Sequence, residues 1–148
     1  AIFNALGRIG AGLISDKIGR INTLASACLL SIVGLYFMYI SGEGDVRTFY
    51  IGISIIGICF GSFMGVFPGF TADQFGAKNN SVNFGIMFSG FAIAGYVGPT
   101  IMTNTLKATG SYKGAFLIGI AFSIAGLLLT FAYRSVNKKV NTILAAQK

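Results

Sequence analysis

Residues 48–72 read TFYIGISIIGICFGSFMGVFPGFTA, a run of 25 residues without a single Asp, Glu, Lys or Arg. A helix of roughly 20 apolar residues crosses the ~30 Å hydrocarbon core of a bilayer. This run is therefore long enough to span a membrane. It shows no alternation of apolar and polar residues, which disfavours a barrel strand and favours a helix.

Three further runs have the same character. No charged residue occurs in residues 21–41, 79–106 or 114–133. Only 10% of the 148 residues are charged, against about a quarter in a typical soluble domain, and the mean hydropathy is +0.76. The sequence predicts an all-α, polytopic transmembrane helix bundle.

Polar segments separate these runs and set the expected boundaries. Residues 1–14 read like the end of a further helix, so the chain is expected to be a fragment of a larger bundle. We expect Pro68-Gly69 to close the span that begins at residue 48, because proline removes a helical hydrogen bond. The other expected segments are a polar turn at 15–20, a connector at 71–81, a span at 82–102, a link at 103–113 and a basic tail at 134–148.

Several functions are disfavoured by what the sequence lacks. There is no histidine, and the two cysteines lie inside separate predicted spans, so neither a metal site nor a Cys-His nucleophile is expected. No phosphate-binding loop motif occurs, and no cofactor is expected. The net charge of +7 is better explained by basic residues that flank membrane spans than by nucleic-acid binding. We therefore do not expect an enzyme.

Basic residues predict the orientation. Eight of the eleven fall on one side of the predicted spans and three on the other, and the side with more Lys and Arg normally faces the cytoplasm. This places the turn at 15–20, the connector at 71–81 and the C-terminus in the cytoplasm. The expected location is the plasma (inner) membrane.

Small residues recur at a spacing of four, which places them on one stripe of a helix. Such stripes let transmembrane helices approach closely, although membrane helices are rich in glycine in any case. The predicted packing residues are Gly57, Gly61, Gly65 and Gly69 in one span and Gly90, Ala94 and Gly98 in the next.

The segment GLISDKIGR, residues 12–20, is the most informative polar stretch. It supplies Gly12, Asp16, Lys17, Gly19 and Arg20 at a membrane exit. Asp16 could pair with a nearby arginine or face a helix N-terminus and so form a latch that breaks when helices move. The alternative is a charged turn that merely ends a span.

Arg8 lies eight residues before Asp16, or ~12 Å deeper along a helix. Arginine keeps its charge, so at that depth it needs a partner or a watery cavity. No acidic residue lies within the four full spans. Arg8 is therefore a candidate for binding a substrate carboxylate, with Asn4 one turn away. Two alternatives are that Arg8 extends to the membrane surface or pairs with an acid outside this chain.

The spacing Gly-x-x-x-Asp-x-x-Gly-Arg at 12–20 resembles the loop signature of the major facilitator superfamily. With four spans after it, the resemblance implies the second copy of that signature. Residues 1–14 would then end helix eight, residues 15–20 would form the cytoplasmic latch loop, residues 21–133 would hold helices nine to twelve, and Asp73 would join the latch.

FPGFTADQFG at 67–76, NFG at 83–85 and GYVGP at 95–99 resemble the oxalate:formate antiporter family within that superfamily. The resemblance implies that Arg8 contacts a substrate carboxylate. It also implies a lysine in helix eleven, but residues 82–102 contain no basic residue, and a neutral residue such as Phe91 stands there instead. A single cation suits a monoanion. Phe88, Ser89 and Phe91 are the other candidate binding residues.

These observations favour a secondary transporter of small organic anions, most of all monocarboxylates such as formate, lactate or pyruvate. Proton symport and anion exchange both stay open, because no titratable group falls within a full span; Asp16, Glu43, Asp45 and Asp73 lie in turns. The alternatives are a non-transporting sensor or assembly protein and an exporter of other substrates. The expected partners are the substrate anion, the lipid bilayer and the helices that would precede residue 1.

Overall fold

The computed structural model describes residues 1–42 and 44–146, with side chains up to residue 138; Glu43 therefore lies outside the described residues. Five helices follow one another: α1 (Ile2–Ile18), α2 (Arg20–Ile40), α3 (Val46–Phe75), α4 (Asn80–Thr109) and α5 (Lys113–Ala146). No strand occurs in the described part of the chain. The prediction of an all-helical protein is confirmed.

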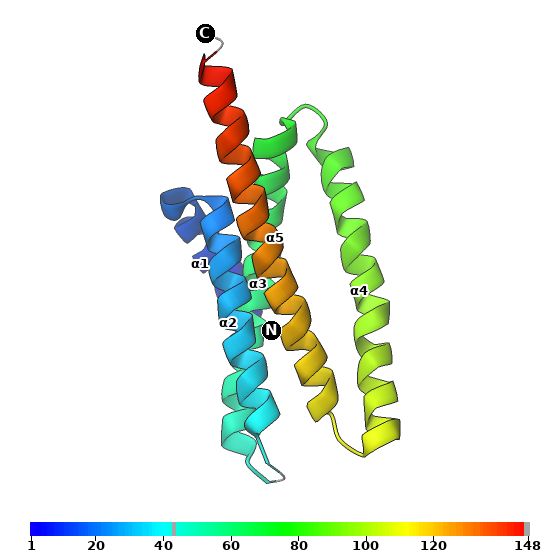
Figure 1. The fold of residues 1–148 in the computed structure, drawn as a ribbon. Coiled ribbons are helices and arrows are strands. Elements are labelled where there is room, and N and C mark those ends of the chain that lie inside the picture. The colour runs from blue at the N-terminus through cyan, green and yellow to red at the C-terminus, as the bar shows by residue number, and fades with distance from the viewer. Residues whose placement is uncertain (43, 147–148) are drawn as a thin grey trace.

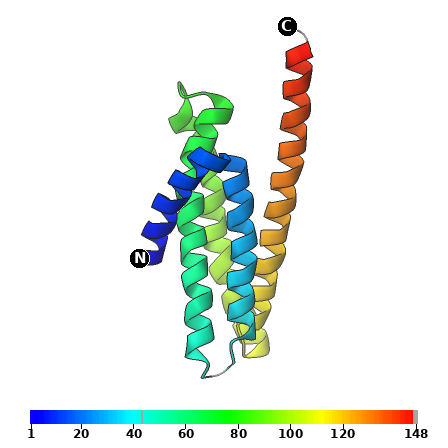
Figure 2. The same ribbon diagram turned by 90° about the vertical axis from the view of Figure 1, so that its left-hand side faces the viewer.

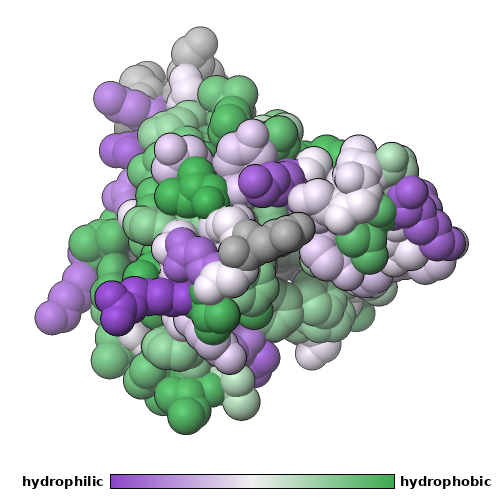
Figure 3. Space-filling model, turned by 90° about the horizontal axis from the view of Figure 1, so that it is seen from below, coloured by the Kyte–Doolittle hydropathy of each residue, from purple (hydrophilic) through white to green (hydrophobic). Residues whose placement is uncertain are grey.

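Four helices are long and apolar enough to cross a membrane. They are α2, α3, α4 and residues Lys113–Lys138 of α5. Large apolar side chains such as Ile9, Leu30, Ile93 and Leu129 are exposed on the outside of the bundle. Seen end-on, apolar residues gather around much of its outline (Figure 3). A surface of this kind is stable in lipid, so the chain is an integral, multi-pass membrane protein.

The predicted turn at residues 15–20 is almost entirely helical. α1 continues to Ile18, and α2 begins at Arg20. Only Gly19 interrupts them, with a φ of 88° that other residues rarely adopt. The expectation of a loop was wrong here, because polar residues do not end a helix by themselves. The hydroxyl of Ser15, for example, donates a hydrogen bond of 2.8 Å to the carbonyl of Gly12 within α1.

Pro68 does not end its helix, contrary to the sequence prediction. α3 continues through it to Phe75. Side chains near the proline bond its carbonyl oxygen: the hydroxyl of Thr71 donates at 2.8 Å, and the side-chain amide of Asn80 donates at 3.3 Å. Thr71 is fully buried. Proline removes only its own N–H from the helix, and packing against α1 and α2 supports α3 on both sides of it.

The other connections are also shorter than predicted. α3 and α4 are separated by residues 76–79, and α4 and α5 by residues 110–112. Residues 134–146, expected as a tail, continue α5 as helix. The sequence prediction ends each span where its apolar run ends. The helices continue further, because backbone hydrogen bonds hold a helix together in water as well as in lipid.

Asp45 caps the start of α3, at the end of the bundle opposite the junction of α1 and α2. Its carboxylate accepts a hydrogen bond from the backbone N–H of Thr48 at 3.2 Å. Hydrogen bonding from the side chain and backbone of Thr48 lowers the pKa of the Asp45 carboxyl from its ordinary value. This cap fixes where α3 begins.

α3 is the centre of the bundle. α1 and α2 pack against it, α5 packs against α2, and α4 makes a looser contact with α3 and α5 (Figure 1). Figure 2 shows α1 leaning against α3 at an angle, with α2 and α5 following across the view. Val66 of α3 is completely buried between Ala11 and Leu24, so the three helices meet around it.

The glycine stripe of α3 faces α1. A Cβ atom on Gly65 would lie 2.7 Å from the carbonyl oxygen of Arg8, and one on Gly61 would collide with the carbonyl oxygen of Asn4. Gly57 faces the side chain of Phe3. On the other side of the contact, a Cβ on Gly7 would collide with the carbonyl of Ile58. The two backbones therefore touch with no side chain between them, which we call the α1–α3 seam.

The small residues of α4 face open space in the described residues. No atom lies within 4 Å of a Cβ built on Gly90 or Gly98. No residue of α4 is fully buried. Their packing role stays a prediction. In α5, by contrast, Gly119 contacts Leu35 of α2, and Ser123 is hydrogen-bonded to Ser31 at 3.0 Å.

We predict that Gly61→Ala destabilises the protein by about 1–3 kcal/mol, because the new methyl group forces two backbones apart. Thermal unfolding of the purified protein in detergent would measure it. Gly126→Ala is the matched control, since its Cβ would lie 3.6 Å from the sulfur of Cys28, an ordinary contact. Equal midpoints for the two variants would contradict a seam of touching backbones.

Candidate functional site

Charged side chains from three helices meet at one end of the bundle. Arg20, at the start of α2, donates from Nε to Oδ2 of Asp73 near the end of α3, at 2.5 Å. Nη2 of Arg20 lies 3.9 Å from Oδ1 of Asp16 in α1. One guanidinium thus links the ends of α1, α2 and α3. We call these three residues the Arg20 cluster.

Gly69 explains how the guanidinium reaches this position. A Cβ on Gly69 would overlap the guanidinium of Arg20, so glycine at this position lets the charged group lie directly against α3. Gly19 supplies the turn that brings Arg20 next to the end of α1. Of the other predicted latch residues, Gly12 contributes only its carbonyl to Ser15, and Lys17 forms no ion pair among the described residues.

α5 adds contacts that the sequence did not predict. Arg134 donates from Nη1 to Oδ1 of Asn22 at 3.1 Å. The hydroxyl of Tyr133 donates to Oε1 of Gln74, and its ring packs edge-on against Phe70. These residues tie the continued part of α5 to α2 and α3. The only signal in the sequence was a basic residue directly after a span, which membrane proteins have for many reasons.

Arg8 lies on the α1–α3 seam. Its backbone contacts Gly61 and Gly65, and its side chain is exposed. Nε of Arg8 donates to Oδ1 of Asn4 at 3.0 Å, one helical turn away. No carboxylate pairs with Arg8 in the described part of the chain. Because the bond to Asn4 uses Nε, the two terminal NH₂ groups are left for another acceptor.

The predicted aromatic residues of α4 line an apolar groove. The ring centres of Phe88 and Phe91 are 4.9 Å apart, and Phe91 lies 5.6 Å from Phe60 of α3. With neighbouring residues of α3 and α4 they enclose a cavity of about 310 Å³. Ser89 is not part of this lining, and its hydroxyl donates to the carbonyl of Ile86 at 2.6 Å.

Arg8 and the aromatic groove lie on different sides of α3. α1 and α4 both pack against α3 and make no contact with each other. The glycines of α3 face α1, whereas Phe60 faces α4. Among the described residues the candidate binding residues therefore form two separate surfaces.

No metal site is apparent. No group of three or more Asp, Glu, Cys or His side chains that could hold an ion occurs among the described residues. Cys28 and Cys59 are free and buried.

Comparison with known proteins identifies the family. A family model described as Major Facilitator Superfamily matches residues 1–147. The chain belongs to the major facilitator superfamily. The spans, the Arg20 cluster and the signature at residues 12–20 all agree with this membership. No solved structure matches.

Two curated relatives of this major facilitator protein are transport proteins by name. An oxalate:formate antiporter of Oxalobacter formigenes is 31% identical over 144 residues, which are 94% of this chain and 34% of that protein. An uncharacterized MFS-type transporter, YhjX of Escherichia coli, is 33% identical over 93 residues, which are 63% of this chain and 23% of that protein. The chain thus spans about a third or less of these relatives. The family agrees with the expectation that it is no enzyme.

We predict that Arg20 and Asp73 are more strongly coupled than Arg20 and Asp16, because their contact is shorter. Exposed ion pairs contribute about 0.2–1 kcal/mol, and both carboxylates are more than half exposed. We therefore expect the first pair near the upper limit and the second near zero. Double-mutant cycles with Arg20→Ala, Asp73→Ala and Asp16→Ala, read by unfolding in detergent, would measure both couplings. Equal couplings would disprove the assignment of Asp73 as the main partner.

Proposed function

We propose that this chain is part of a secondary transporter that moves small organic anions, most of all monocarboxylates, by alternating access. The observation that carries the proposal is the Arg8 guanidinium. It is held by Asn4, backed by the α1–α3 seam, and has no carboxylate partner in the described residues.

Electrostatics favour a carboxylate as the partner of Arg8. An arginine at membrane depth stays charged and is costly to leave unpaired. Its planar group binds a carboxylate through two parallel hydrogen bonds. Nε is already bonded to Asn4, so the terminal NH₂ groups are the natural donors to a substrate. One bound monoanion would balance the charge of Arg8.

The neutral surface of α4 supports a substrate with one charge. From Asn80 to Leu106, α4 has no basic residue, and Phe88 and Phe91 offer an apolar wall. A second carboxylate placed there would have no cation and would lose its hydration. Formate, lactate and pyruvate carry one carboxylate each. The 31% identical relative is named for both oxalate and formate, and the second of these is a monoanion.

The proposal also assigns the Arg20 cluster as a cytoplasmic latch. Its ion pairs join the ends of α1, α2 and α3, so they would resist any motion that separates these ends. Residues 1–14 would belong to helix eight and residues 21–133 to helices nine to twelve of a twelve-helix transporter. The excess of Lys and Arg at this end supports its cytoplasmic position in the plasma (inner) membrane.

We predict that the full-length protein in proteoliposomes takes up labelled formate, lactate or pyruvate. Arg8→Ala should lower the transport efficiency roughly 10- to 100-fold, the value of a charged hydrogen bond of about 1.5–3 kcal/mol. Arg8→Lys should restore part of it. Arg47→Ala, which removes an exposed cation at the opposite end of the bundle, is the control and should leave uptake unchanged.

The same assay separates the competing functions. A transporter that ignores all simple carboxylates would exclude the proposed substrate class and leave an exporter of other compounds. A protein that moves no solute would favour a sensor or assembly role. Uptake that survives Arg8→Ala undiminished would remove Arg8 from the binding site while leaving the transporter assignment intact.

We predict that Phe91→Lys raises oxalate uptake relative to formate in a transport state that brings α4 toward Arg8, since α3 separates the two residues in this arrangement and a second cation would match the second carboxylate. Phe91→Leu is the matched control, since it keeps the position neutral and should not favour oxalate. The ratio of initial rates for the two labelled anions would measure the change. An unchanged ratio in Phe91→Lys would show that residue 91 does not face the substrate.

A further inference from the structure

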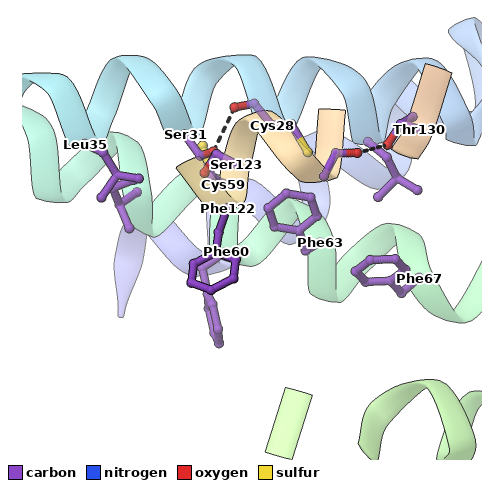
Figure 4. A pocket seen from close by; sticks show the side chains of 13 residues that line it. Cys28, Ser31, Leu35, Cys59, Phe60, Phe63, Phe67, Phe122, Ser123 and Thr130 are labelled. Atoms are coloured by element: carbon purple, nitrogen blue, oxygen red, sulfur yellow. Dashed lines mark hydrogen bonds between the residues drawn. The ribbon is translucent and has the colours of Figure 1, made fainter. Parts of the chain in front are cut away.

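A second cavity lies between α2, α3 and α5, and it shares a wall of Phe60, Phe63 and Phe67 with the aromatic groove of α4. Its volume is about 520 Å³, and its walls include Leu24, Cys28, Phe63, Phe67 and Thr130. In Figure 4 the rings of Phe60, Phe63 and Phe67 extend from α3 into this space, and Ser31 and Ser123 meet at its edge. All three helices are membrane spans. The cavity therefore lies at the depth where these helices would cross the bilayer.

The hydroxyl groups of this cavity are already bonded within the protein. Ser31 donates to the carbonyl of Cys28 at 2.8 Å and lies 3.0 Å from the hydroxyl of Ser123. Thr130 donates to the carbonyl of Gly126 at 2.8 Å. The walls therefore present carbon and sulfur to a ligand, which suits a hydrocarbon chain.

A polar pocket lies one helical turn beyond this cavity on each of the three helices. Its volume is about 230 Å³, and Arg20, Asn22, Asp73 and Arg134 line it. The two linings are connected in sequence: Arg20 precedes Leu24 by four residues, Phe70 follows Phe67 by three, and Arg134 follows Thr130 by four. The two pockets therefore follow one another along the same three helices, about one helical turn apart.

The polar pocket is suited to an anion. Asp73 is paired with Arg20, whereas Arg134 bonds the neutral Asn22 and forms no ion pair in the described residues. The first hydrogen bond of α2 runs from the N–H of Thr23 to the carbonyl of Gly19. The amides of the residues between them, including Ile21 and Asn22 of this lining, thus have no acceptor within the helix. A cation beside a helix N-terminus is a common setting for phosphate.

We propose that this combined site binds an anionic phospholipid. The phosphate lies between Arg134 and the first turn of α2, and one acyl chain follows Thr130, Phe67 and Leu24 into the apolar cavity. A soluble phosphate would use the polar pocket alone and leave the apolar cavity without an occupant. The succession of a polar and an apolar pocket along three helices that are able to span a membrane is what favours a lipid.

The test compares retention of phosphatidylglycerol and phosphatidylcholine by the full-length protein, using native mass spectrometry after detergent exchange. We expect preferential retention of phosphatidylglycerol. Arg134→Gln should reduce that preference about fivefold, as expected for one basic residue at an anionic headgroup. Arg47→Gln removes a cation far from this site and should leave the preference unchanged.

A second pair of variants tests the acyl-chain cavity without changing charge. Thr130→Phe fills the cavity and should reduce retention of both lipids. Leu129→Phe places the same phenyl ring on the neighbouring residue, which is 70% exposed and outside the cavity lining, and should have no effect. Thermal unfolding of each variant shows that it is folded.

Three outcomes would overturn the proposal. They are equal retention of the two lipids, a preference that survives Arg134→Gln, and displacement of phosphatidylglycerol by an equal concentration of glycerol phosphate. The last result would assign the pocket to a soluble phosphate. None of these outcomes depends on whether the protein transports carboxylates, so the lipid site and the proposed function fail separately.

Discussion

The contact between the backbones of α1 and α3 is the constraint on which the other features depend. Gly61 and Gly65 allow the carbonyls of Asn4 and Arg8 to lie directly on α3. Its stability comes from close packing along the glycine stripe of α3, together with the burial of Ala11 and Val66 beside it. It fixes the rotation of α1 and thereby decides where the Arg8 side chain emerges. It also places the end of α1 beside Arg20 and Asp73.

The spans could be predicted from the sequence because lipid imposes a simple rule on them. A charge-free run of 20 or more residues must cross the bilayer as a helix, and each such run did form one. Their ends could not be predicted in the same way. Hydropathy reports where lipid ends, whereas α3 continues through Pro68 and α5 through residues 134–146 because of their backbone hydrogen bonds and, for α3, packing against neighbouring helices.

The candidate site was predictable to the extent that it is local. Asn4 and Arg8 are four residues apart, so helical spacing alone placed them together. Contacts between helices depend on how each helix is rotated, which a single sequence does not specify. The bond from Arg134 to Asn22 and the separation of Arg8 from Phe88 by α3 are of this kind. The pairing of Arg20 with Asp73 could have been expected, because both residues lie at ends of predicted spans on the same side of the membrane.

Three arginines of this chain show how the same charge acquires different roles from its surroundings. Arg20 has two carboxylates within 4 Å and links the ends of three helices. Arg8 and Arg134 each bond only a neutral asparagine among the described residues, so each keeps most of its donors and its full charge. The difference between them lies in their neighbours: Arg134 lies one turn from an apolar cavity and beside a helix N-terminus, whereas Arg8 lies on the bare backbone of α3 at Gly61 and Gly65. A lipid phosphate suits the first setting, and a small carboxylate that can leave again suits the second.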